Sequence, residues 1–197
     1  MPAVGHREAL LEGAKHCLRE RGYARTTARD IVAASSTNLG SIGYHFGSKE
    51  ALLTEAIIES FEEFGDALAG ALAETPPAGD PYERFAARCS RVIEAMMEHR
   101  GVWAASVEAF IQSQHLPAVR ERLGEALEMG RTGLASLLEG IPENAPEARA
   151  VGSLHLALLD GLMIQWLVDP ERAPSGEDLA AGLRTILGRA DPPSSEA

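Results

Sequence analysis

The 197-residue sequence contains few of the residues that define disulfide-rich, metal-binding, β-sheet or membrane proteins. Its two cysteines, Cys17 and Cys89, form no CxxC pair, which argues against a disulfide scaffold or a zinc–thiolate site. Only 5% of the residues are aromatic, and no segment alternates polar and apolar residues as a half-buried strand does. No apolar run approaches the eighteen or so residues of a membrane span, and the N-terminus has no signal-peptide core. These absences predict a cytoplasmic protein without a membrane partner.

Positive charge is also scarce, and it is unevenly distributed. The net charge of −11, taken alone, argues against nucleic-acid binding. Residues 1–50 nevertheless contain seven lysines and arginines against five acidic residues, a net charge of +2, whereas the rest of the chain has a net charge of −13. Such an asymmetry predicts two parts that face different partners.

Prolines and the spacing of apolar residues divide the chain into helices. No proline occurs between Pro2 and Pro76, and the later prolines fall in short clusters. Between these breaks apolar residues recur every three or four positions, which is typical of amphipathic helices. The sequence therefore predicts an all-α protein of about nine helices, followed by a disordered tail at 190–197 that is rich in proline and serine. We expect three short helices within 6–46 and further helices at 48–74, 81–99, 102–113, 116–139, 147–168 and 176–188.

Two short capped helices near the N-terminus carry the functional signal. Thr27 can cap one helix while Asp30 reaches back to complete a capping box, and Asn38 can cap the next helix. A capped helix, a short turn and a second capped helix are the parts of a helix-turn-helix motif. An ordinary corner between helices is the alternative, but Gly40 and Gly43 each cost ~1 kcal/mol relative to alanine. The second helix would present Leu39, Gly40, Ser41, Gly43, Tyr44 and His45, with Ile42 and Phe46 turned to the core.

The segment from about Arg7 to Leu53 resembles the DNA-binding head of the tetracycline-repressor (TetR) family. The resemblance rests on Gly22-Tyr23, Thr26-Thr27, Ile31, Gly40-Ser41-Ile42, Tyr44-His45-Phe46 and, most specifically, Ser48-Lys49-Glu50-Ala51-Leu52-Leu53. It implies that Thr27, Tyr44 and Lys49 bind the DNA backbone. It also implies that Ser41 faces bases or phosphates and that His45 flanks the phosphates. The expected DNA-binding residues are Thr26, Thr27, Asn38, Leu39, Gly40, Ser41, Gly43, Tyr44, His45 and Lys49.

The sequence departs from the family pattern at two places. Gly43 stands where the family usually has a tyrosine, and Ser36 and Thr37 replace a common Gly-Val pair in the turn. Arg25 and Arg29 either restore affinity for the DNA backbone or are ordinary solvated arginines. Because of Gly43, a second hypothesis stays open: a helical small-molecule-binding or adaptor protein whose head no longer binds DNA.

The chain after the head is interpreted from its physical pattern. We divide the whole sequence into a DNA-binding domain at 1–60 and a ligand-binding and dimerisation domain at 61–189. The helix at 147–168 is apolar on nearly every face, which predicts burial at a subunit interface. With the helix at 176–188 it would form a four-helix bundle between two protomers. The family resemblance also places the dimer interface on the last two helices.

A pocket for an unknown small molecule is expected among the helices at 81–99, 102–113, 116–139 and 147–168. Thioethers adapt to irregular ligands, and a histidine can supply a polar contact. Plain core packing is the alternative for each of these residues. The candidates are Met96, Met97, His99, Trp103, Phe110, Met129, His155 and Met163.

Catalysis finds no support in the sequence. No nucleophile elbow on a strand, P-loop or dinucleotide-binding motif is present, and the six histidines never occur at metal-ligand spacing. We therefore expect neither an enzyme nor a metal or cofactor site. The resulting hypothesis is a homodimeric regulator, a repressor of a pseudo-palindromic operator, that a small and largely apolar ligand releases from double-stranded DNA.

Overall fold

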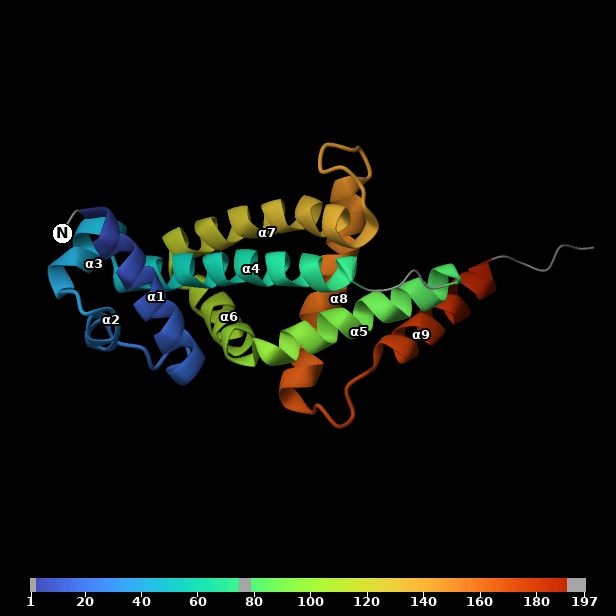
Figure 1. The fold of residues 1–197 in the computed structure, drawn as a ribbon, viewed down its shortest axis with the longest axis horizontal. Helices are drawn as coiled ribbons and strands as arrows, with labels where there is room; N and C mark the ends of the chain where they lie inside the picture. The colour runs from blue at the N-terminus through green and yellow to red at the C-terminus, as the bar shows by residue number, and fades with distance from the viewer. Residues whose placement is uncertain (1–2, 75–78, 191–197) are drawn as a thin grey trace, which may run out of the picture.

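The computed structural model describes residues 3–74 and 79–190, and these form nine α-helices without a β-strand (Figure 1). The predicted all-α fold is confirmed, and each helix after the head begins and ends within about two residues of its expected bounds. The first helix begins earlier than expected, at Ala3. The predicted tail at 190–197 lies, from residue 191 on, outside the described residues. The helices are α1 Ala3–Arg21, α2 Ala28–Ser35, α3 Leu39–Phe46, α4 Lys49–Ala73, α5 Pro81–Glu98, α6 Arg100–Ser113, α7 Pro117–Glu139, α8 Ala148–Val168 and α9 Gly176–Ala190.

The head consists of α1, α2, α3 and the first turns of α4, packed around one apolar core. Leu10, Leu18, Ile31 and Leu53 are fully buried in it, and Ile42 of α3 is 4% exposed. Residues spaced one turn apart on short helices thus meet at a common centre, as the apolar pattern predicts. The short helices depend on this packing because isolated helices of eight residues are unstable in water.

The predicted helix caps of the head are confirmed. Thr27 Oγ1 accepts a hydrogen bond from Asp30 N at 3.2 Å, and Asp30 Oδ2 accepts one from Thr27 N at 2.9 Å. Asn38 Oδ1 accepts from the amide at the third position of α3, at 3.1 Å. Ser48 caps α4 in the same way, with its Oγ accepting from the amide of residue 51 at 3.0 Å. Side-chain chemistry therefore fixes where the helices of the head begin.

A buried lysine fixes α1 to α4, the long helix that runs from the head into the body. Lys15 is 1% exposed, and its Nζ lies 2.6 Å from Glu63, 2.9 Å from Glu12 and 3.0 Å from Glu59. Burial alone would lower the pKa of Lys15, but the hydrogen bonds to Glu63 and Glu12 outweigh it and raise the pKa above its usual value. The ammonium group therefore stays charged at neutral pH and holds α1 against α4.

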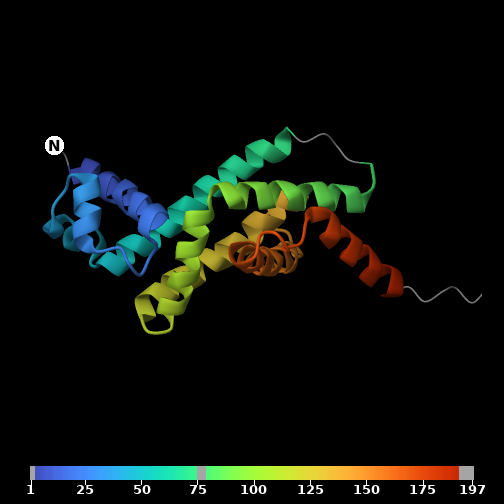
Figure 2. The ribbon, with the colours of Figure 1, turned by 90° about the horizontal axis from the view of Figure 1, so that it is seen from below.

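The body has a second apolar core, to which α4, α5, α6, α7 and α8 contribute. Its buried members include Leu68, Met96, Leu159 and Met163. Helix α8 packs across α7, and α9 lies along α5 (Figures 1 and 2). The head and the end of α9 lie at opposite ends of the long axis of the molecule.

Helix α8 is not buried on all sides within one protomer, and its burial at a subunit interface stays a prediction. Leu154, Ile164 and Val168 are 61%, 52% and 79% exposed, and α9 packs on α5 rather than covering them. By length and mean hydropathy α8 is also the one helix of the described chain apolar enough to cross a membrane. It nevertheless carries Asp160, and one side of it packs on α7 as the core helix of a globular domain does.

Candidate functional site

Helices α2 and α3 form the expected helix-turn-helix, and the unusual turn residues fit it. Ser36 adopts a left-handed conformation, with a φ of 53°, and its N–H donates to Val32 O. The hydroxyl groups of Ser35 and Thr37 lie 2.7 Å apart and are hydrogen-bonded across the turn. A left-handed residue other than glycine is uncommon, so the surrounding hydrogen bonds stabilise this turn where the family has glycine.

Most of the residues expected to contact DNA lie together on the exposed side of α3. Tyr44 is 81% exposed and Leu39 is 53% exposed. Gly40 and Gly43 are exposed as well, and a Cβ built at Gly43 would meet no atom within 4 Å. The remaining members are Asn38, which is exposed at the N-terminus of α3, and the half-buried His45, whose ring stacks edge-on with Tyr44 at 4.9 Å.

Two of the predicted DNA contacts are wrong because their side chains turn inward. Thr26 is 1% exposed, and its hydroxyl donates to Gly22 O at 2.7 Å, so it closes the end of α1 instead of facing solvent. Ser41 is 9% exposed and lies beside the buried Ile42 on the packed side of α3. The exposed face of α3 is therefore formed by its first two residues and by residues 43 and 44.

Thr27 and Lys49 flank this face and already make contacts within the head. Thr27 is exposed, and its hydroxyl donates to Asp30 at 2.7 Å; this hydrogen bond holds the pKa of the Asp30 carboxyl below its usual value. Lys49 Nζ donates to Thr26 O at 3.1 Å and lies 3.3 Å from Glu50. Both residues are positioned by the protein itself, and their contact with DNA stays a prediction.

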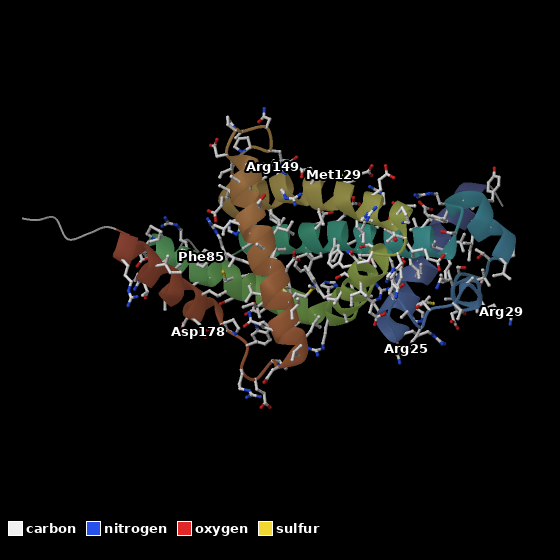
Figure 3. The ribbon with its side chains drawn as sticks, turned by 180° about the vertical axis from the view of Figure 1, so that it is seen from behind. Arg25, Arg29, Phe85, Met129, Arg149 and Asp178 are labelled. Carbon is white, nitrogen blue, oxygen red and sulfur yellow. The ribbon has the colours of Figure 1, made fainter. Side chains whose placement is uncertain are left out.

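Arg25 and Arg29 lie on the surface of the head, Arg25 beside the turn that contacts α6 and Arg29 farther from the body (Figure 3). Arg25 Nε donates to Arg21 O at 2.8 Å, which places the guanidinium at the end of α1. Arg29 lies in the first turn of α2. Both side chains are accessible to a phosphate, and the choice between a DNA contact and a solvated arginine remains open.

Four of the predicted ligand residues meet in the core of the body. Met96, Trp103 and Met163 are buried together, and Met97 packs against them. His99, at the junction of α5 and α6, stacks edge-on against Phe64 at 6.0 Å. Apolar and polarisable side chains from α4, α5, α6 and α8 thus surround a single tryptophan.

Two other predicted ligand residues lie elsewhere, and these predictions are wrong. Phe110 packs against the core of the head, because α6 passes from the body core to α1. Met129 is 55% exposed on the outer side of α7 (Figure 3). Helical spacing alone could not separate these residues from the core, since each fits an apolar position on its helix.

A hollow that contains His155 lies between α5, α7 and α8, three of the four helices among which the sequence predicts a pocket. Arg88 Nη1 lies 2.6 Å from Glu139 Oε2, and His155 Nε2 lies 3.0 Å from Glu139 Oε1. Burial raises the pKa of the Cys89 thiol to about 11, so this thiol is protonated at neutral pH. Apart from Glu139, which pairs at its rim, the hollow is lined by Phe85, Arg88, Cys89, Val92, Leu138, His155, Leu158, Leu159 and Leu162.

Helix α6 contacts both the head and the end of α8 through charged residues. Glu108 Oε2 accepts a hydrogen bond from Ala24 N, in the turn after α1, at 2.7 Å. Arg100 donates to Trp166 O at 3.0 Å and to Leu167 O at 2.7 Å, at the carbonyl end of α8. A cation is favourable at a helix C-terminus. Neither of these two contacts could be predicted from the sequence.

Comparison with known proteins decides the family. Residues 10–56 match the family model described as bacterial regulatory proteins of the tetR family, and residues 80–189 match the tetracyclin repressor-like C-terminal domain. The chain belongs to the TetR family of transcriptional regulators. The head and the body defined by the structure thus correspond to the two parts of a TetR-family regulator.

Related TetR-family proteins support this assignment, and they match stretches of the chain that differ in length. The regulator TtgR of Pseudomonas putida is 27% identical over 177 residues, 84% of this chain and 81% of TtgR. The repressor AcnR of Corynebacterium efficiens is 43% identical over only 49 residues, about a quarter of this chain and 26% of AcnR. The likeness to AcnR is therefore confined to a segment the length of the head.

Solved structures share the fold of the whole chain. A transcriptional regulator from Rhodococcus superposes with a TM-score of 0.72 at 17% identity, over 93% of this chain and 95% of that one. The multidrug-binding protein EbrR in complex with imidazole is 26% identical, with a TM-score of 0.62, over 100% of this chain and 96% of that one. The head and the body therefore share one fold with these two proteins.

Proposed function

We propose that the protein is a cytoplasmic, homodimeric transcriptional repressor that binds a pseudo-palindromic operator and leaves it when a small molecule binds the body. The exposed face of α3, capped by Asn38 and carrying Tyr44, supports this proposal most directly. It lies in the part of the chain with a net positive charge, whereas the body is strongly acidic. An acidic body repels DNA, so contact is confined to the head.

The head offers two kinds of contact to DNA. Thr27, Tyr44 and Lys49 would bind phosphates on either side of α3, as the flanks of a helix-turn-helix do. Gly40 and Gly43 let the backbone of α3 approach the base edges closely, and exposed Leu39 suits contact with a thymine methyl group. Glycine in place of tyrosine at position 43 thus leaves room in the DNA groove. The other residues of the α3 face still offer contacts to DNA.

The exposed stripe of α8 supports self-association. Leu154, Ala157, Gly161, Ile164 and Val168 are all exposed, and their spacing alternates between three and four residues. This is the spacing of the seam between two packed helices. Gly161 lies at the middle of the stripe, and a Cβ built there meets no atom within 4 Å of its own protomer. A second copy of α8 fits this stripe and would cover it by two-fold symmetry.

Helix α6 provides a physical connection between the dimer helix and the head. Arg100 ties its start to the end of α8, Glu108 ties its middle to the turn after α1, and Trp103 lies between them in the body core. A ligand that displaces Trp103 would move α6 and with it the head. Such coupling is reciprocal, so operator DNA would weaken ligand binding by the same factor.

The body is the part that would bind the effector. EbrR, whose fold this chain shares, has been solved with imidazole and with proflavin, which supports a small-molecule site in bodies of this fold. In this chain the candidate residues are those that meet around Trp103 together with His155 at the hollow. We propose no catalytic role for the protein, since its relatives are named as regulators.

A mobility-shift titration on the DNA flanking its own gene tests this function. The wild-type protein is expected to bind in a salt-dependent manner, and the double variant Tyr44→Ala with Lys49→Ala is expected to lose about 100-fold or more in affinity. Met129→Ala, on the exposed side of α7, serves as the control and should bind as the wild type does. Retained binding by the double variant would defeat the assignment of the face, and binding of an effector without any DNA affinity would favour the adaptor alternative.

A further inference from the structure

Trp103 carries a buried hydrogen-bond donor without a partner. Its side chain is 7% exposed, and its indole Nε1 has no acceptor within reach among the described residues. The ring contacts Phe61 and Phe64, at centroid distances of 4.8 and 5.3 Å, and neither side chain offers an acceptor. Leaving a buried donor unpaired lowers the stability of the fold, so its presence calls for an explanation.

The other tryptophan shows how this fold satisfies an indole when no ligand is needed. Trp166 Nε1 donates to Pro174 O at 3.1 Å, in the loop that follows α8. The two tryptophans therefore differ in one property that a ligand would use: only Trp103 has a free N–H inside the body core. Trp166 becomes a matched control for Trp103.

The hollow between α5, α7 and α8 borders the same cluster, and Trp103 itself is not among the residues that line it. Val92, Leu138 and Leu159 line the hollow and also belong to the buried core around Trp103. The polar donors at its rim are Arg88 and His155. The carboxylate of Glu139 is already paired with both of them, and no residue that lines the hollow within the described chain carries a carboxylate of its own.

The distance between the rim and the core sets the length of a ligand that would span them. Arg88, Val92 and Met96 follow one another at one-turn intervals along α5. Eight residues at 1.5 Å per residue place Met96 about 12 Å from Arg88 along the helix axis. Met96 lies in the cluster with Trp103, and the flexible thioethers of Met96 and Met163 can yield to a ligand.

We propose that the body binds an elongated, largely apolar ligand with an acceptor oxygen near each end. The inner oxygen accepts from Trp103 Nε1, and the outer oxygen accepts from Arg88 or His155 at the rim. This inference rests on the proposed function and deepens it by naming the chemistry of the effector. Arg88 pairs with Glu139 through one of its five N–H groups and keeps others for a ligand. Donors at both ends favour carbonyl or carboxylate oxygens over a cationic group.

Calorimetric titration of the full chain with two flat three-ring probes tests the proposal. Anthraquinone-2-carboxylate carries carbonyl and carboxylate oxygens, whereas proflavin is a cation of similar size. The acid is expected to bind more tightly than proflavin. Trp103→Phe should weaken its binding about 3- to 10-fold, and Trp166→Phe should change it by less than about two-fold. Thermal unfolding of each variant shows whether it is folded.

The indole N–H resonances of the wild-type protein give the same answer without any substitution. Hydrogen bonding to the acid should shift the Trp103 resonance downfield and leave that of Trp166 in place. Tighter binding of proflavin, equal losses in the two tryptophan variants or an unmoved Trp103 resonance would each overturn the proposal. A protein that binds its operator but prefers proflavin keeps the proposed function, whereas one that binds the acid through Trp103 but no DNA loses only that function.

Discussion

The head and the body differ in charge and in what they expose. The head has a net charge of +2 over residues 1–50 and exposes the glycines and Tyr44 of α3. The body is acidic, and on α8 it exposes an apolar stripe that includes Leu154, Ile164 and Val168. A surface with glycines and a polar side chain lets nucleic acid come close to the backbone and bind it. An apolar stripe is suited to packing against a second protein surface. The proposed DNA-binding surface and the proposed dimer surface thus lie in different parts of the chain. Helices α4 and α6 connect these two parts.

The largest expected effect comes from breaking the stripe of the body. Gly161→Arg places a long charged side chain at its centre and should convert the dimer to a monomer. Operator affinity should then fall about 100-fold or more, because two linked heads bind far more tightly than one. Sedimentation equilibrium and operator titration measure the two effects.

Gly124→Arg is the matched control for the stripe. Gly124 is an exposed glycine of α7, and a Cβ built there also meets no atom within 4 Å. This variant should remain dimeric and should bind the operator as the wild type does. A dimeric Gly161→Arg protein would show that the α8 stripe is not the subunit interface.

A smaller effect is expected from cutting the link between the two regions. Glu108→Ala removes the acceptor for Ala24 N, a charge-assisted hydrogen bond of 2.7 Å. The Ala24 amide should exchange with solvent hydrogen about 5- to 10-fold faster, which corresponds to about 1 kcal/mol. Hydrogen exchange resolved by NMR measures this rate. Glu121→Ala, at an exposed position of α7, should leave the exchange rate of the Ala24 amide unchanged. Equal exchange rates in the two variants would show that Glu108 does not connect α6 to the head.

The same separation explains what the sequence could predict. The helix starts of the head depend on residues that are neighbours in the sequence. The sequence therefore predicts Thr27, Asn38 and Ser48 as helix caps, and all three caps are confirmed. Burial is not local in this way. Thr26 and Thr27 look equivalent in the sequence, but packing against α1 turns one inward and leaves the other exposed.

The candidate site of the body could be predicted only in part. The apolar spacing identified Met96, Trp103 and Met163 as core residues, because any helix buries such a stripe. Arg88, Glu139 and His155 come from three helices, of which only α7 and α8 are consecutive, and their meeting depends on how α5, α7 and α8 cross. The same crossing leaves Met129 outside.

The salt dependence of operator affinity tests the central claim, that the head alone holds DNA, most directly. Each lost phosphate contact lowers the slope of log affinity against log salt by about 0.9. The variant Lys49→Gln removes the head cation that is proposed to bind the DNA backbone, so it should lower the slope of a dimer by about 2. Arg120→Gln, at an exposed arginine of the body, should leave the slope unchanged. Equal slopes for the two variants, or a slope lowered by the body variant alone, would contradict the account.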